Sequence, residues 1–405
     1  MTRIGIGMTL QRRVLLWMCV LVAVNQFGFG AMVPSVPLYA QSFGVPASAI
    51  GLAIAAYGLA RFMSALPAGK LSDILGRRQS LAIGGLISAI GNLWCAWATS
   101  YPEFIIARFV AGFGAGLVLT TGNIVLADIS TPEVRGRMIA VYQGTFLFSV
   151  GLGPFPGGLL AEHFGLAAPF LFSGLGAFLA TVVAWFAVEE TREMARSSAG
   201  GSAVTVSFFA QMRTLMSNVG YVLVSLISLM NAVVRTGGLF AIIPLLATAR
   251  LGLSISAIGF GMMLGSIAGL FAAYPAGGLA DRYGRKAVIV PATLISGTSM
   301  VLFCFAPNYA WFTAACIVWG IAISAGGSAP AAYAADTAPP GMNAAAMSTF
   351  RMTGDLGYVI GPLALGLIAD LYGPVTALLS GAGALILVGA AFAVIAAETH
   401  PRRHP

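Results

Sequence analysis

Long apolar runs alternate with short polar segments along the chain. Twelve such runs follow one another. They lie at about residues 14–38, 48–68, 80–99, 103–126, 138–160, 167–188, 219–246, 255–275, 287–306, 309–333, 346–368 and 374–396. Apolar runs of about 20 residues without strict alternation are typical of helices that cross the hydrocarbon core of a bilayer. The pattern predicts an all-α integral membrane protein with twelve transmembrane helices, because a lipid-facing backbone must satisfy its hydrogen bonds internally.

The composition excludes a soluble globular domain. Of the 405 residues, 58% are hydrophobic and 8% are charged, whereas soluble domains carry about 25% charged residues. The formal net charge of +8 is spread over short loops, so it gives no basis for a nucleic-acid partner. The four cysteines all fall in predicted spans, and no disulfide framework is expected.

The basic residues predict the orientation. Most of the 21 Lys and Arg residues lie in segments that share a side with the N-terminus, and Arg250 is the one in an external loop. Since cytoplasmic loops carry the excess of Lys and Arg, both termini are predicted in the cytoplasm. The first apolar run is too long for the core of a signal peptide, and we expect it to be retained as a span.

The chain is an internal repeat with a constant shift of 208 residues. The polar stretch Gly69–Arg78 (GKLSDILGRR) returns as Gly277–Lys286 (GGLADRYGRK). The same shift relates Asp128 to Asp336, Gly153-Pro154 to Gly361-Pro362, and Glu190-Thr191 to Glu398-Thr399. One offset over this length predicts a duplicated six-span unit. We expect two pseudo-symmetric six-helix bundles, residues 1–188 and 219–405 with a short cytoplasmic tail, joined by a cytoplasmic linker at 189–218.

The linker contains the only sustained polar stretch of the chain, EETREMARSSAGGSA. Its Ser, Gly and Ala content favours a flexible tether. The alternative for its latter part, Val204–Leu215, is a short amphipathic helix on the membrane surface.

Twelve spans in two halves, with one motif between spans 2 and 3 and again between spans 8 and 9, resemble the major facilitator superfamily over the whole chain. The resemblance implies that each half is a bundle, that the substrate binds between the bundles near the midplane, and that the halves rock to alternate access. The branch most like this chain is that of bacterial twelve-span drug or metabolite:proton antiporters. That branch implies the bacterial inner (plasma) membrane and a monomer.

The repeated motif is a candidate cytoplasmic gate. Gly69 and Gly76 are expected to allow close approach and unusual backbone angles. Asp73 is expected at a helix N-terminus, where the helix dipole favours an anion, with Arg77 bridging it to another acid. By resemblance, that acid is Asp128, and the cluster latches the two halves when the outside gate is open; the alternative is that these arginines only follow the positive-inside bias. The candidate residues are Gly69, Asp73, Gly76, Arg77, Arg78 and Asp128, with Gly277, Asp281, Gly284, Arg285, Lys286 and Asp336 in the second half.

Arg108 lies within span 4 and is followed by Gly112, Gly114 and Gly116. The glycines allow close helix packing, and Arg108 lies too deep to reach the interface easily, so it needs a buried partner or water. This pattern is similar to one that the family associates with proton coupling or conformational control. A purely structural hydrogen-bond centre explains it equally well.

Span 5 resembles at its core the signature of antiporters in the family, with Gly153, Pro154, Gly157 and Gly158. Its upstream part departs from the signature, because Ala140 and Ser149 stand where glycines are expected. Span 11 repeats the core with Gly361 and Pro362. Proline and glycine predict bent, closely packed helices. The signature favours export over import, and ordinary packing of a kinked helix is the alternative.

The remaining charges within spans are Arg61, Arg235, Arg351 and Asp355. An intramembrane charge is a functional-site hypothesis by default. Asp355 is the only acid predicted near the midplane, which makes it the candidate for a proton-titrating carboxylate. A fixed ion pair with Arg351, one helical turn away, is the alternative. Arg61 is a candidate for the cavity lining or the cytoplasmic gate, and Arg235 faces either the cavity or another helix.

Span 1 departs from the family's drug exporters. Many of those carry an acid in this helix, where this chain has Asn25 and Gln26. Proton coupling through span 1 is therefore not expected. The excess of intramembrane arginines over acids also allows an anionic substrate.

The sequence shows no catalytic arrangement, metal-ligand spacing or phosphate loop, so we expect neither an enzyme nor a cofactor or metal. The main hypothesis is a secondary active transporter that works by alternating access and exports drugs or metabolites in exchange for protons. The alternatives are a proton-coupled importer of an organic anion, with Arg235 and Arg108 as charge partners, and a permease-like membrane sensor or scaffold. The expected partners are a small-molecule substrate, protons and the lipid bilayer.

Overall fold

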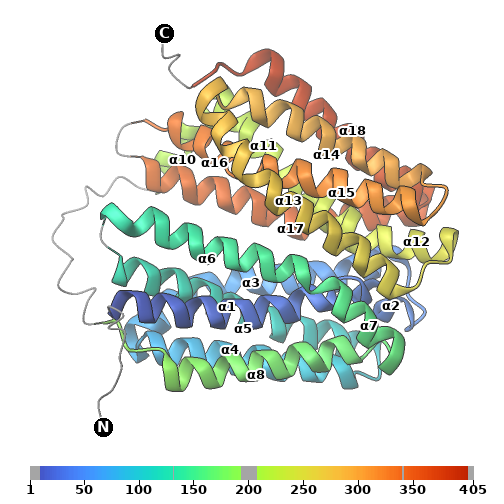
Figure 1. Ribbon diagram of the computed structural model, residues 1–405, viewed down its shortest axis with the longest axis horizontal. Coiled ribbons are helices and arrows are strands. Elements are labelled where there is room, and N and C mark those ends of the chain that lie inside the picture. The colour runs from blue at the N-terminus through green and yellow to red at the C-terminus, as the bar shows by residue number, and fades with distance from the viewer. Residues whose placement is uncertain (1–9, 131, 193–207, 340–341, 400–405) are drawn as a thin grey trace. The chain divides into compact units, whose positions relative to one another are not determined.

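The computed structural model describes residues 10–130, 132–192, 208–339 and 342–399 (Figure 1). Within these ranges all regular secondary structure is helical. Half of the predicted linker, residues 193–207, lies outside them. The all-α prediction is confirmed for the part of the chain that is described.

By its contacts the chain divides into two compact units. The first unit draws on residues 1–32, 59–153 and 167–202, and the second on residues 33–58, 154–166 and 203–405. The first contains α1 (Leu10–Met32), the later part of α3 (Ala47–Leu75), α4 (Arg77–Trp97), α5 (Tyr101–Ile129), α6 (Pro132–Leu152) and α8 (Ala168–Ala187). The second contains the start of α3 together with α2 (Ser35–Gln41), α7 (Pro154–Phe164), α10 (Phe208–Met216), α11 (Val219–Val233), η1 (Val234–Ile242), α12 (Ile243–Leu251), α13 (Ile255–Tyr283), α14 (Lys286–Phe305), α15 (Tyr309–Ala325), α16 (Ala329–Asp336), α17 (Asn343–Tyr372) and α18 (Pro374–Ile395).

Twelve helical segments in the described chain are long and apolar enough to cross a membrane. Each overlaps one predicted run, which confirms the predicted number and order of the spans. Two of them are interrupted helices, α6 with α7 and α15 with α16, and a third changes helix type without a gap from α11 through η1 to α12. The element η1 is a π-helix of nine residues. Such wide turns are rare and often occur at functional sites.

Each unit has its own apolar core. In the first unit the core includes Met18 and Leu21 of α1, Leu126 of α5 and Tyr142 of α6. In the second unit the core includes Tyr221 of α11, Ile289 of α14, Tyr333 of α16 and Phe392 of α18. The helices of a unit therefore bury side chains against one another, as in a packed bundle.

Glycines bring α4 and α5 into backbone contact. A Cβ atom added to Gly91 would lie 2.6 Å from the Cα of Ala111, and one added to Gly114 would lie 2.8 Å from the Cα of Ser88. A Cβ on Gly116 would lie 2.9 Å from the Cα of Arg61 in α3. Small residues at these positions thus allow the close packing that drives helix association where no hydrophobic effect operates.

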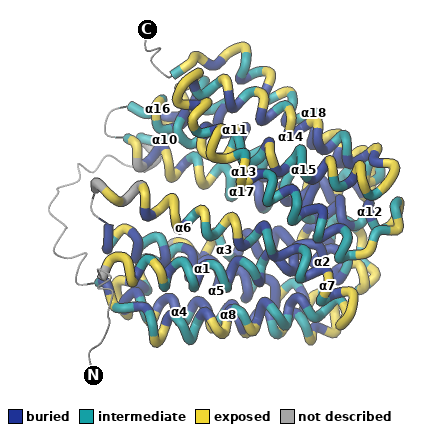
Figure 2. The backbone as a smooth tube through the Cα atoms, in the orientation of Figure 1, coloured by how far each residue is buried: buried dark blue, intermediate teal, exposed yellow. Residues whose placement is uncertain are grey.

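The outer faces of the helices carry large apolar side chains. Phe186 of α8, Phe271 of α13 and Val394 of α18 are 79%, 76% and 84% exposed, and the exposed stretches are drawn in yellow in Figure 2. A soluble protein rarely exposes apolar surface on this scale. These faces suit a hydrocarbon solvent, in agreement with the predicted spans.

The latter part of the linker forms a helix. α10 covers Phe208–Met216 and contacts α11 and α17. The expected tether is wrong for these residues, and the alternative of a short helix holds there. Its packing on two neighbouring helices gives the segment a partner that a tether would lack. The division into bundles at 1–188 and 219–405 stays a prediction.

Candidate functional site

The chain reverses between α3 and α4 at Gly76. This residue has φ of 103° and ψ of 165°, a combination that is essentially confined to glycine. A Cβ atom at Gly76 would also overlap the carboxylate of Glu190. The repeat behaves in the same way: Gly284 between α13 and α14 has φ of 100°, and a Cβ there would lie 2.6 Å from Oε2 of Glu398. Both glycines are therefore required by backbone angle and by space.

A carboxylate caps the N-terminus of the helix after each reversal. Glu190 accepts hydrogen bonds from the backbone N–H groups of Arg77 (3.0 Å) and Arg78 (3.2 Å), the first residues of α4. Glu398 accepts from the N–H groups of Arg285 (3.0 Å) and Lys286 (3.0 Å) in front of α14. The first N–H groups of a helix have no partner within the helix, and its dipole attracts an anion, so each glutamate satisfies both requirements.

The guanidinium of Arg77 joins three helix ends of the first unit. Its Nε donates to Oδ2 of Asp128 at 2.9 Å, and its Nη1 donates to Oδ1 of Asp73 at 2.8 Å and to the carbonyl of Ser72 at 2.9 Å. Thr191 donates its hydroxyl to the same Oδ2 of Asp128 at 3.0 Å. The side chains of Arg77 and Asp128 are each 7% exposed. A charge buried to this degree needs its counter-charge, so this cluster ties α3, α4 and α5 together.

The second half repeats the cluster in a looser form. Arg285 lies 2.5 Å from Asp281 and 3.4 Å from Asp336, and its side chain is 18% exposed against 37% for Asp336. Thr399 donates to Asp336 at 3.4 Å. The hydrogen bond that Arg285 donates to Asp281 is the main cause of the raised pKa of Arg285, which keeps the guanidinium charged. Water reaches this copy more easily than the first, so its ion pairs are weaker.

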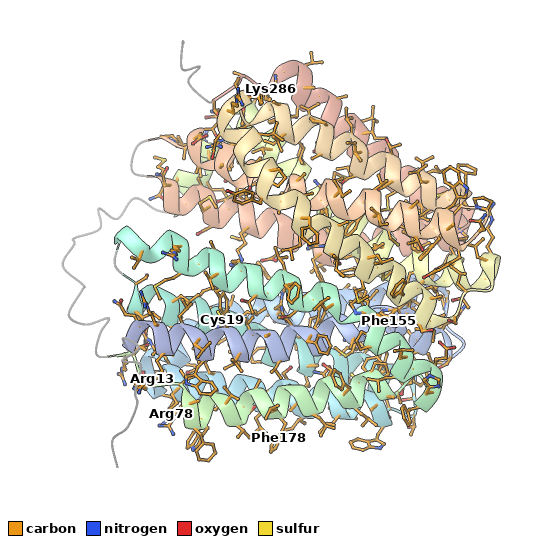
Figure 3. All side chains as sticks on the ribbon, in the orientation of Figure 1. Arg13, Cys19, Arg78, Phe155, Phe178 and Lys286 are labelled. Carbon is orange, nitrogen blue, oxygen red and sulfur yellow. The ribbon has the colours of Figure 1, made fainter. Side chains whose placement is uncertain are left out.

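The last residue of the motif differs between the halves. The guanidinium of Arg78 lies over the ring of Trp185, 5.2 Å from its centroid. Lys286 instead donates through Nζ to the carbonyls of Ala393 (2.9 Å) and Ala396 (2.6 Å) at the C-terminus of α18. Figure 3 labels both residues. The charge is kept across the repeat, but it serves a cation–π contact in one half and a helix C-terminus in the other.

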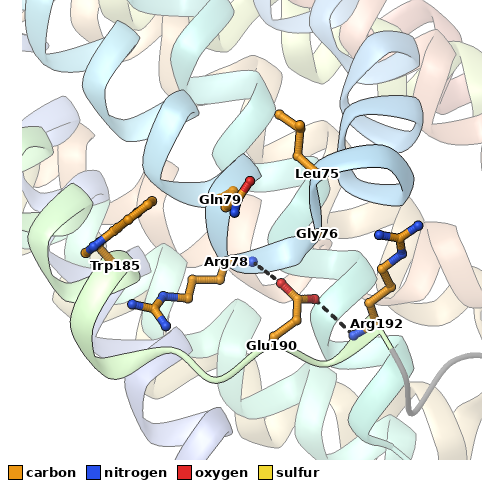
Figure 4. Close-up of a pocket in the computed structure, with 7 residues that line it drawn as sticks. All are labelled: Leu75, Gly76, Arg78, Gln79, Trp185, Glu190 and Arg192. Carbon is orange, nitrogen blue, oxygen red and sulfur yellow. Dashed lines mark hydrogen bonds between the residues drawn. The ribbon is translucent and has the colours of Figure 1, made fainter.

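A surface pocket of about 420 Å³ lies beside the first cluster. Figure 4 shows Glu190 between Arg78 and the backbone of Arg192, and the N–H of Arg192 donates to Glu190 at 3.0 Å. The other lining residues are Leu75, Gly76, Gln79 and Trp185. The pocket is thus organised by the same carboxylate that caps α4.

Two expectations for the motif need correction. Asp73 was expected at a helix N-terminus, but it lies in the last turn of α3, where it pairs with Arg77. The N-terminus of α4 is capped by Glu190 instead. Gly69 and Gly277 lie inside α3 and α13, and an added Cβ on either would meet nothing within 4 Å. Of the glycines in the motif and its repeat, Gly76 and Gly284 are the two with the unusual backbone angle. Sequence reasoning missed the roles of the Glu-Thr pairs after spans 6 and 12, Glu190-Thr191 and Glu398-Thr399. Their repetition at the 208-residue shift is the signal that could have found them.

The intramembrane polar residues of the first half lie in the first unit. Asn25 and Gln26 of α1 are 6% and 2% exposed, and Arg108 of α5 is 2% exposed. Arg61 of α3 is half-buried, and its carbonyl accepts the hydroxyl of Ser64 at 2.9 Å. Burial of this order in a helix bundle is the setting in which a charge acts as a functional or structural centre.

Those of the second half lie in the second unit. Arg235 is half-buried in η1, where its neighbour Thr236 donates to the carbonyls of Ala232 (2.8 Å) and Tyr358 (3.4 Å). In α17, Nε of Arg351 lies 3.9 Å from Oδ2 of Asp355, and their side chains are 64% and 30% exposed. That distance is too long for a hydrogen bond, so the pair is a loose one. Within the described residues, no group of three or more His, Cys, Asp or Glu side chains is arranged to hold a metal ion.

The antiporter-like core of span 5 coincides with a break in the helix. α6 ends at Leu152 and α7 begins at Pro154, with Gly157 and Gly158 in α7. A Cβ on Gly153 would lie 2.5 Å from the backbone nitrogen of Ala31 in α1. In the repeat, α17 runs on through Pro362, and a Cβ on Gly361 would lie 2.6 Å from the Cα of Val233. The two copies share close packing, while only the first interrupts its helix.

The two kinds of glycine in the motif give a matched test. We expect Gly76→Ala to lower the free energy of unfolding by about 1–3 kcal/mol, because alanine cannot adopt the backbone angle without strain. Gly69 lies inside α3, where an added Cβ meets nothing within 4 Å. Gly69→Ala should therefore leave the free energy of unfolding unchanged or raise it by up to about 1 kcal/mol. The apparent thermal midpoint of the purified protein in detergent measures both. Equal midpoints for the two variants would contradict the claim that the backbone at residue 76, unlike that at residue 69, requires glycine.

The two copies of the buried acid give a second test. Asp128→Asn leaves the buried guanidinium of Arg77 without one of its two counter-charges, and we expect a loss of about 3 kcal/mol in the free energy of unfolding. Asp336→Asn, at the more exposed copy, should cost about 1 kcal/mol or less. Thermal midpoints again report the difference. A larger loss for Asp336→Asn would show that burial does not set the strength of the cluster.

Comparison with known proteins identifies the family. The family model described as Major Facilitator Superfamily matches residues 18–234 and 222–405. An uncharacterized MFS-type transporter of Methanocaldococcus jannaschii is 25% identical over 353 residues, which are 86% of this chain and 89% of that protein. The quinolone resistance protein NorA of Staphylococcus aureus is 27% identical over 174 residues, 42% of this chain and 44% of NorA. The matched part of NorA is thus less than half of either protein.

Solved transporters share the fold at low identity. The nucleoside transporter NupG superposes with a TM-score of 0.78 at 16% identity, covering 94% of this chain and 98% of NupG. The human organic anion transporter MFSD10 gives a TM-score of 0.66 at 19% identity, covering 95% of this chain and all of that one. The family match over both halves and the twelve helical spans agree. The chain therefore belongs to the Major Facilitator Superfamily of membrane transporters.

Proposed function

We propose that the protein is a secondary active transporter that exports a drug-like or metabolite small molecule in exchange for protons. The observation that carries the direction of transport is the break between α6 and α7 at Gly153 and Pro154, where the sequence resembles the antiporter signature. The partial similarity to NorA, a quinolone resistance protein, supports the same direction. The bacterial inner membrane, cytoplasmic termini and a monomeric state belong to this proposal.

Asp355 is the residue that we assign to proton coupling. Among the described residues it is the one carboxylate that lies more than two helical turns from either end of a span. Its side chain is 30% exposed, so a proton can reach it, and Arg351 is near enough at 3.9 Å to respond to its charge. Transfer of a proton to the carboxylate of Asp355 is the coupling step that we propose. Neutralising it frees Arg351, which is the electrostatic change that a coupled transporter needs.

Alternating access is supported by the repeated cytoplasmic clusters. Each half carries an arginine between two acids, at Arg77 and at Arg285. Within each unit these clusters make the helix ends rigid, so a bundle can move as one body. Rocking of two such bundles about a central substrate is the transport cycle that we propose.

A second candidate is the proton-coupled import of an organic anion. It is favoured by Arg235, which lies half-buried in the π-helical turn of span 7. A π-helix widens the backbone and aims side chains in new directions, which suits a ligand contact. Arg235 and Arg108 would then be the charge partners of the substrate.

Transport into everted membrane vesicles tests the direction and the coupling. We expect uptake of lipophilic cations that depends on an imposed proton gradient, because everted vesicles turn export into uptake. Asp355→Asn should lower gradient-driven uptake at least about tenfold while substrate binding, measured by ligand-dependent thermal shift, persists. The matched control is Glu103→Gln, which alters a partly exposed carboxylate in the first turn of α5, at its external end.

The outcomes separate the candidates. Full gradient-driven uptake by the Asp355→Asn variant would remove Asp355 from the coupling step. Uptake of organic anions alone, by right-side-out vesicles, would favour the importer and would be lost in Arg235→Gln. An absence of transport for every compound in both vesicle orientations would contradict both candidates for those substrate classes.

A further inference from the structure

Four helix ends of the second unit meet in two equivalent pairs on the side that the topology places outside. α7 packs against the start of α13, and the end of α17 packs against the start of α3. The shift of 208 residues relates the pairs, since it carries α7 onto the end of α17 and the start of α3 onto the start of α13. We call these contacts the external pairs.

Glycines let the backbones touch in both external pairs. A Cβ atom on Gly51 would overlap the carbonyl oxygen of Pro362, and one on Gly259 would overlap that of Pro154. A Cβ on Gly158 would lie 2.6 Å from the carbonyl of Ile255, and one on Gly366 would lie 2.7 Å from that of Ala47. Each glycine is the repeat equivalent of another in this set. The two pairs are thus packed in the same way, by glycines at equivalent positions of the repeat.

A carboxylate fastens each pair at its outer end. Asp370, near the end of α17, accepts through Oδ1 from the N–H of Ala47 (2.7 Å) and through Oδ2 from the N–H of Ser48 (2.9 Å) at the start of α3. Glu162, near the end of α7, accepts the hydroxyl of Ser256 at the start of α13. Glu162 is the repeat equivalent of Asp370, and Ser256 that of Ser48. A change of acid between the copies hides this relation in the sequence.

We propose that Asp370 and Glu162 are the positioning residues of the external closure: they hold the two external pairs together in the state closed to the outside, and the pairs open jointly. The proposal rests on transport by alternating access, since only a cycling transporter opens and closes this side. Neither acid touches the residues assigned to substrate or proton binding. Their role is to set the population of the closed state.

The physical basis is the unpaired start of a helix. The first N–H groups of α3 have no partner within the helix, and its dipole favours a negative charge. Asp370 supplies two acceptor oxygens to two such groups. Both acids are exposed, so water can replace these hydrogen bonds when the pairs separate. A contact of this kind adds to closure without making it permanent.

Hydrogen–deuterium exchange of the full-length protein in nanodiscs tests the proposal without any substrate. Asp370→Asn offers only one acceptor oxygen, and its NH₂ group cannot accept the second N–H. We expect exchange at residues 47–51 to rise about tenfold or more. Because the pairs open jointly, exchange at residues 255–259, in the other pair, should rise as well. Ser256→Ala should produce the reciprocal effect at residues 47–51.

The matched control is Glu103→Gln. Glu103 accepts from the N–H of Thr99 at 2.8 Å at the external end of α5, but it joins no external pair. Exchange in both segments should equal that of the wild type. A rise confined to residues 47–51 in Asp370→Asn, or unchanged exchange in both segments, would overturn the proposal. A misfolded variant would show itself by lost protection in α4 and α5, and Ser256→Ala then decides the question.

Discussion

The interaction on which this structure depends is the capping of one helix by a carboxylate from another segment. Glu190 and Glu398 cap α4 and α14 after the two sharp reversals, and Asp370 caps the start of α3. A helix that ends near a membrane surface has N–H groups that neither lipid nor its own backbone can satisfy. An acid supplied from elsewhere in the chain meets that need and fixes where the helix end lies.

Duplication explains why the caps come in pairs, and divergence explains why the pairs differ. The same positions give a tight cluster at Arg77 and a looser one at Arg285, with 7% and 37% exposure of the partner acids Asp128 and Asp336. Thr191 and Thr399 repeat their contacts at 3.0 and 3.4 Å. The two copies contain the same residue types and the same contacts, but the second copy is more exposed. The contribution of a contact to stability in one half therefore does not predict that of its equivalent in the other half. A low dielectric strengthens the first copy and water weakens the second.

Hydropathy predicted the spans well because the bilayer leaves few alternatives to a helix of about 20 apolar residues. The resemblance to the family predicted Asp128 as the acid that Arg77 joins to Asp73, and the repeat placed Asp281 and Asp336 at the equivalent positions of the second half. The sequence could not distinguish Gly69 from Gly76, because a glycine serves equally in a helix and in a strained turn. Nor could it show η1, the π-helical stretch that packs against α17, because the apolar run through it has no feature that distinguishes a π-helix from an α-helix. Tertiary contacts decide such local choices.

In the transport cycle that we propose, burial separates the contacts that we expect to last from those that we expect to open. The ion pair of Arg77 and Asp128 is 7% exposed at both partners, and separating it would leave a charge in a medium that cannot solvate it. The hydrogen bonds of Asp370 and Glu162 lie at exposed positions, where water takes the place of either partner. A net contribution of about 1 kcal/mol for each such hydrogen bond is enough to shift a population and too little to lock it. The transport cycle that we propose needs both kinds of contact, since the bundles must stay intact while the closure between helix ends is made and broken.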